Sequence, residues 1–146
     1  MKTRIMCIVS LVLILLMFSI PTSAEDAFAP ESSSDRRASD LIKGYSCAFL
    51  CYGKTLQATA KISTADMADK VGISRLEIQE KRGDDWVAVK WVEDTYDYNA
   101  YDHSYTLTYT GRNGYEYQAV AKFYVKAGAL SDTASKTSVI QEIPAT

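Results

Sequence analysis

The amino-acid sequence predicts an all-β protein, folded as a two-sheet antiparallel β-sandwich of about seven strands. Three observations support this. Apolar and polar residues alternate with a period of two from Tyr45 almost to the C-terminus. Turn-forming segments interrupt the alternation about every 8 to 15 residues. The alternating stretches are rich in valine, isoleucine, threonine and tyrosine, which strands favour. A small closed β-barrel is the alternative architecture.

The first part of the domain is expected to hold a strand and a short turn of helix. Residues 56–62 (LQATAKI) alternate with period two, with leucine, alanine and isoleucine on one side. The next segment, 63–70 (STADMADK), has Ser63 as a possible N-cap and Asp66 three residues later. This spacing favours a short helical turn between two strands.

A β-hairpin is expected to follow. Its strands are 76–81 (LEIQEK) and 86–92 (WVAVKWV), joined by the turn Arg82–Asp85 centred on Gly83. Simple alternation places three apolar residues of the return strand on one face: Val87, Val89 and Trp91. That face would need another sheet to cover it.

The second half is expected to be a long loop followed by strands. Residues 93–104 (EDTYDYNAYDHS) are acidic and rich in tyrosine, which is typical of a loop. The turn 111–114 contains Asn-Gly, which readily adopts positive φ angles. Ala127-Gly128-Ala129 ends the longest strand. The strands predicted around these breaks are 105–110, 115–125 and 137–143.

The N-terminus predicts export. Lys2 and Arg4 precede an uncharged apolar stretch, and small residues end it at Ala24, as in a cleavable signal peptide. An uncleaved anchor is the alternative, although sixteen apolar residues are short for a membrane span. We therefore expect a signal peptide at 1–24, a flexible leader at 25–44, a β-sandwich domain at 45–146 and a secreted protein.

Charge argues against two classes of partner. Loss of Lys2 and Arg4 with the signal peptide changes the net charge from −2 to −4. The sequence therefore lacks the basic surface that nucleic acids or anionic membranes attract. After signal cleavage, no association with the membrane is expected.

Two stretches resemble fibronectin type III and immunoglobulin-like domains. LEIQEKRGDDWVAV is similar to the third-strand hairpin of those domains, and NGYEYQAVAKFYV is similar to their sixth strand. In the second stretch either Tyr115 or Tyr117 could be the tyrosine of a tyrosine corner. The chain departs from these families because it lacks the Cys…Trp…Cys spacing and most of the prolines.

The chain also resembles a family of small secreted proteins of Gram-positive bacteria that is catalogued as a domain of unknown function. The resemblance covers about Leu41 to Ile140 and includes KVGISRLEIQEK, the tryptophan-containing return strand and a GY-x-Y strand. It implies an exported β-domain. Because the matching positions are structural, it brings no catalytic residues.

The expected loop 93–104 holds the candidate binding residues. Exposed tyrosines beside amides and carboxylates can stack on sugar rings or anchor a protein. The aromatic candidates are Tyr96, Tyr98 and Tyr101, with Asn99 beside them; the alternative is that the tyrosines fold back over the edge of the sandwich. Three carboxylates form a weaker candidate calcium site: Asp94, Asp97 and Asp102.

Other reactive residues are few. His103 is the only histidine, and its neighbours Asp102 and Ser104 are adjacent in sequence, whereas a catalytic triad converges from separate segments. Cys47 and Cys51 can form a disulfide only if the strand between them turns or bulges; free thiols are slightly favoured. We expect no catalytic residues and no cofactor.

These observations predict an exported, non-enzymatic β-sandwich that binds an extracellular glycan, cell-wall polymer or protein. Because sandwich folds host many functions, two other classes remain open. One is a small hydrolase that uses carboxylates of the 93–104 segment. The other is a structural surface protein in which exposed strand edges pair between copies.

Overall fold

The computed structural model describes residues 40–145, which form an all-β domain with antiparallel pairing throughout. The expected signal peptide and most of the expected leader lie outside the described residues. Strand structure begins before Tyr45, because Leu41 is buried and the first strand starts at Ile42. The strands are β1 (Ile42–Tyr52), β2 (Thr55–Arg82), β3 (Asp85–Thr110), β4 (Tyr115–Ala127), β5 (Leu130–Thr137) and β6 (Gln141–Ile143).

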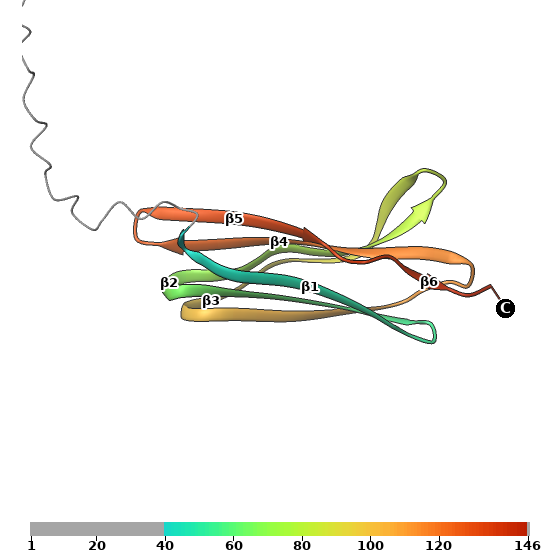
Figure 1. Cartoon of the computed structure of the whole chain (residues 1–146), viewed down its shortest axis with the longest axis horizontal. Coiled ribbons are helices and arrows are strands. Elements are labelled where there is room, and N and C mark those ends of the chain that lie inside the picture. Colours follow the sequence, from blue (N-terminus) through green and yellow to red (C-terminus); the bar gives the residue numbers. More distant parts are fainter. Residues whose placement is uncertain (1–39, 146) are drawn as a thin grey trace, which may run out of the picture. The chain divides into compact units, whose positions relative to one another are not determined.

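The six strands belong to one hydrogen-bonded sheet that curls. β2 pairs with β3 along most of its length; its other edge pairs first with β1 and then with β4. β5 and β6 both pair with β4. Figure 1 shows that β2 and β3 double back midway, so that the β1–β2 and β2–β3 hairpins lie at the same end.

The helical turn expected at 63–70 is wrong, because this segment continues β2 as extended chain. The pairing of β2 with β3 shifts register between Ser63 and Ala68. Within the shift, the buried Thr64 hydroxyl lies 2.9 Å from the Tyr101 carbonyl oxygen and 2.7 Å from that of Asp66. The polar residues of 63–70 therefore lie at a bend in β2. There, side-chain hydrogen bonds replace part of the regular backbone pairing between β2 and β3.

The loop expected at 93–104 is also wrong, because β3 runs through it. Two residues interrupt the strand with positive φ: Asp94 at 56° and Asn99 at 52°. Among the described residues, β3 pairs only with β2, so one of its edges stays open. An edge strand need not alternate polar and apolar residues strictly. The composition of residues 93–104 therefore resembles that of a loop, although the segment is a strand.

The core lies between the two halves of the curled sheet. The rings of Tyr45 on β1 and Phe123 on β4 have centroids 5.4 Å apart, and Gln141 Nε2 donates to the Phe49 carbonyl oxygen at 3.3 Å. Burial of alternate apolar side chains is the main stabilising force. The fully buried apolar residues include Leu56, Ala58, Ala60, Val71, Ile73, Leu76, Ile78, Ala119, Ala121, Phe123 and Val125.

Cys47 and Cys51 are free, half-buried thiols on β1. The strand between them neither turns nor bulges, so their separation stays too large for a disulfide. Burial raises the pKa of the Cys47 thiol to about 11, which keeps it protonated at neutral pH.

The expected hairpin is confirmed, with Arg82 paired to Asp85 and Gly83 at φ 63°. The expectation that Val87, Val89 and Trp91 share a face is wrong, because a register shift separates them. The shift lies between the pairs Ile78–Lys90 and Gln79–Ala88 and leaves Val89 as an extra residue.

The register shift at Val89 determines which side chains of the hairpin face the core and which face outward. Trp91 lies opposite Glu77, which alternates with the buried residues Leu76 and Ile78 and therefore faces outward. Lys90 lies opposite the buried Ile78, so a charged residue occupies the core side of the open edge.

A buried carboxylate, Glu80, pins the end of the core. Its side chain is fully buried and binds Arg82 at 2.9 Å, the Tyr117 hydroxyl at 2.8 Å and the Arg112 guanidinium. The Tyr117 hydroxyl also accepts the backbone N–H of Arg112 at 2.8 Å. Of the two tyrosines considered for a tyrosine corner, Tyr117 is the one whose hydroxyl bonds to backbone upstream of its strand.

These partners determine the charge of Glu80. Desolvation by burial raises its pKa, but hydrogen bonds from Arg112, Tyr117 and Arg82 outweigh that effect and hold the pKa at about 2. Glu80 is therefore ionised at neutral pH, and folding favours the ionised form.

We expect Glu80→Gln to lower the free energy of unfolding at neutral pH by about 2 kcal/mol, because two arginines lose a charged partner. Glu80 ionises below the ordinary value of 4.5. Its contribution is therefore present above about pH 4.5 and is lost as the pH falls toward 2. Denaturant titrations at several pH values should show the difference between wild type and variant shrinking in acid. A difference that is independent of pH would contradict this account.

Candidate functional site

The structure places Tyr96 and Tyr98 on the outer face of the sheet. They lie opposite Gly72 and Lys70 of β2, which alternate with the buried Val71 and Ile73. Tyr98 is 67% exposed. Two other candidates follow on the same strand: Asn99, an exposed residue at a positive-φ kink, and Tyr101, which is 58% exposed.

Tyr96 is held by its neighbours. A Cβ added to Gly72 would lie 2.8 Å from its ring, so the ring packs directly on that glycine. Lys70 Nζ lies 3.8 Å from the ring centroid, and the Tyr124 ring meets it edge-on at 6.1 Å. Burial and a hydrogen bond to Asp94 raise the pKa of Tyr96 to about 12. Tyr96 therefore stabilises this part of the face.

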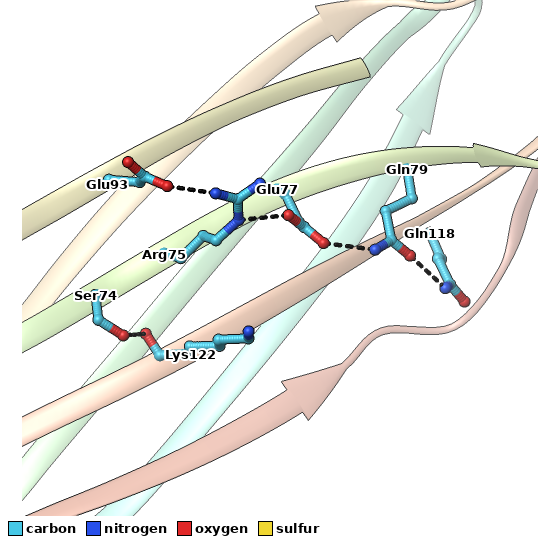
Figure 2. A network of polar contacts seen from close by, with 7 residues as sticks. All are labelled: Ser74, Arg75, Glu77, Gln79, Glu93, Gln118 and Lys122. Carbon is cyan, nitrogen blue, oxygen red and sulfur yellow. Dashed lines mark hydrogen bonds and ion pairs between the residues drawn. The ribbon is translucent and has the colours of Figure 1, made fainter. Parts of the chain in front are cut away.

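Farther along the same face, side chains from three strands form a polar ladder (Figure 2). Arg75 Nε donates to Glu77 at 2.6 Å, and Arg75 Nη1 donates to Glu93 on β3. Gln79 Nε2 donates to the other Glu77 oxygen, and Gln118 Nε2 on β4 donates to Gln79 Oε1 at 2.7 Å. The bond to Glu77 raises the pKa of Arg75, so the ladder contains a permanent positive charge.

Trp91 lies beside the ladder. It is paired with Glu77 across β2 and β3 and is 54% exposed, and the Arg75 guanidinium carbon lies 5.7 Å from its ring centroid. We call Trp91 and the ladder residues together the Trp91 strip; its members are Arg75, Glu77, Gln79, Trp91, Glu93 and Gln118. The strip combines an accessible indole with amide, guanidinium and carboxylate groups that are fixed by one another.

Sequence reasoning missed this strip. The signal that could have found it is the spacing Arg75-x-Glu77-x-Gln79 on one face of a strand. Aligning Trp91 and Glu93 with these residues needs the register of the hairpin. That register depends on the extra residue Val89.

The three candidate calcium ligands are not brought together. Asp94 accepts a hydrogen bond from Tyr96 at 3.1 Å, Asp97 pairs with His103 at 2.8 Å, and Asp102 lies opposite Ser63. Within residues 40–145, no group of three or more His, Cys, Asp or Glu side chains is placed to hold a metal ion.

His103 belongs to the bend of β3. Its side chain is 10% exposed and its Nδ1 lies 2.8 Å from Asp97 Oδ2, so the pair joins the strand before the bend to the strand after it. His103, Asp102 and Ser104 line a hollow of about 430 Å³ that also borders β1 and β2. Because His103 pairs with Asp97, the adjacent Asp102 does not orient its ring as a triad would require.

Comparisons with known proteins assign no family. No family model matches the chain, and no curated protein matches it. A search of solved structures finds the sporulation control protein Spo0M of Bacillus subtilis, with 12% sequence identity and a TM-score of 0.37. The match covers 67% of this chain and 49% of that protein, so the chain spans about half its length. A likeness of this size assigns neither a fold family nor an activity.

Within residues 40–145, no helix is both long and apolar enough to cross a bilayer.

We expect Gly72→Ala to destabilise the protein by about 1 to 3 kcal/mol. The new Cβ would lie 2.2 Å from the Thr95 carbonyl oxygen and would displace the Tyr96 ring. Gly44→Ala is the matched control, because its Cβ would meet only Ser63 Oγ at 3.5 Å. Denaturant unfolding of both variants provides the measurement. Equal effects at the two glycines would show that the contact between Tyr96 and Gly72 does not constrain the sheet.

Proposed function

We propose that the protein is exported and acts outside the cell as a non-enzymatic binding module, with the Trp91 strip as its contact surface. The observation that carries the proposal is Trp91 itself: a large aromatic side chain, 54% exposed, beside a line of fixed polar groups. Tryptophan is among the residues most enriched as anchors of recognition surfaces.

Export is supported by the N-terminal pattern, in which Lys2 and Arg4 precede an apolar stretch that ends at Ala24. The resemblance of the chain to small secreted proteins of Gram-positive bacteria points the same way. A binding protein exported alone needs a rigid scaffold and one accessible face, and a curled sheet with a buried inner side supplies both.

Tyr98 extends the proposed contact surface. It lies on the outer face of β3, as Trp91 does, on the far side of Tyr96. Tyr96 contributes by packing against Gly72 and Tyr124, which fixes this part of the sheet. Of the three tyrosines predicted to bind in the 93–104 segment, Tyr96 is thus anchored, whereas Tyr98 and Tyr101 are exposed.

We also infer that the curled sheet is a variant of the two-layer sandwich of immunoglobulin-like domains. The tyrosine-corner bond of Tyr117 supports this inference, as do the contacts of Tyr45 with Phe123 and of Gln141 with Phe49 across the core. In this variant β2 and β3 contribute to both layers.

We expect the protein to be found in the medium or at the surface of the cells that produce it, with Glu25 as the first residue of the mature chain. N-terminal sequencing and intact-mass analysis of the exported fraction provide the test. A chain retained in the cell with Met1 in place would refute the export part of the proposal.

We expect Trp91→Ala to weaken retention on the surface of the producing cells by roughly tenfold, because the strip loses its anchor. Tyr52→Ala is the control: Tyr52 is 62% exposed but lies at the end of β1, in the other half of the sheet. Both variants should unfold like wild type. Pull-down with fluorescently labelled protein gives the measurement, and equal retention of all three proteins would rule the strip out.

A further inference from the structure

The Trp91 strip offers both donors and acceptors along one line. Its amides, Gln79 and Gln118, each carry two N–H donors and a carbonyl oxygen, and the ladder bonds use one N–H of each. Arg75 adds further N–H donors and Glu93 adds an acceptor at the other end. A partner that lies along this line must present hydroxyls or similar groups that both donate and accept.

The indole of Trp91 adds a flat apolar surface beside this line, opposite Glu77. Its cross-strand partner Glu77 is 12% exposed in its side chain, whereas Trp91 is 54% exposed, so the ring is the accessible part of the pair. A pyranose ring has this same combination: apolar C–H groups on its faces and hydroxyls around its rim. An indole can pack on the face while amides and carboxylates bind the rim.

Charge and apolar area argue against other partners. The strip carries one cation, Arg75, and two anions, Glu77 and Glu93, which form ion pairs with it. Lys122 lies opposite Arg75 on β4 and adds a second cation, so these four charges cancel and the strip gives no net attraction to an anionic polymer. A protein partner would require a broader apolar centre, whereas Trp91 is the one aromatic residue among the six residues of the strip.

The geometry points to a neutral polysaccharide chain as the ligand, and we propose that one sugar ring packs on Trp91 with its rim toward the ladder, while the chain continues along β3. This inference rests on the proposed function of the strip. Trp91 and Tyr98 are seven residues apart on the outer face of one strand, which is at most about 23 Å in extended chain. A chain of several sugars can therefore contact both rings. Tyr96 and the positive-φ residue Asp94 lie between them along β3.

The test measures binding of the secreted protein to insoluble cellulose and chitin, and to cell walls from which protein and anionic polymers have been stripped. We expect retention on at least one of these polysaccharides. Retention should fall roughly tenfold in Trp91→Ala and by a smaller factor in Gln118→Ala. It should be partly restored in Trp91→Tyr and unchanged in Tyr52→Ala. Soluble oligosaccharides of the retained polymer should compete.

The outcomes separate this inference from the proposed function. Binding to intact cells could depend on Trp91 and yet be abolished by protease treatment of the cells. If that binding also survives enzymatic digestion of the cell glycans, the ligand is a protein. The polysaccharide assignment is then overturned and the contact surface stands. If Trp91→Ala changes retention on neither cells nor polysaccharides, both are overturned.

Discussion

The long antiparallel ladder between β2 and β3 is the constraint on which the rest of the domain depends. These strands span Thr55–Arg82 and Asp85–Thr110, several times the usual strand length. A twisted ribbon of that length cannot bury its apolar side alone. By doubling back at its middle it places Ala58 and Ala60 of one half in the same core as Ile73 and Leu76 of the other. One hairpin thus supplies both sides of the core.

This arrangement also determines where chemistry can occur. Each strand gives its inner residues to the core, and the outer residues are free to form the polar ladder from Glu93 to Gln118. The two ends of the core are closed differently. Glu80 and Tyr117 fix one end through buried hydrogen bonds, and the pair of His103 with Asp97 joins the two halves of β3 near the bend. The outer face rests on a scaffold fixed at two places.

Sequence reasoning identified the class of fold because alternation and turns are local signals. The turn at Gly83 and the break at Gly128, with φ of 63° and 59°, lie where the sequence predicts them. The prediction from sequence was wrong at 63–70 and 93–104. Polar residues there lie at strand bends and on an open strand edge, and not in a helical turn or a loop. The Trp91 strip was missed for a related reason: a single extra residue, Val89, moves Trp91 to the other face, and local periodicity does not contain that shift.

The open edge of β3 has a consequence for how copies of the protein behave when crowded. An uninterrupted edge of this length would let a neighbouring chain add its own strand and template fibril growth. Here the regular row of donors and acceptors is divided by the bulge at Val89 and by the left-handed residues Asp94 and Asn99. Lys90, which lies opposite Ile78 of β2, adds an exposed charge to this edge strand. These interruptions make the open edge of β3 a poor template for strand addition between crowded copies.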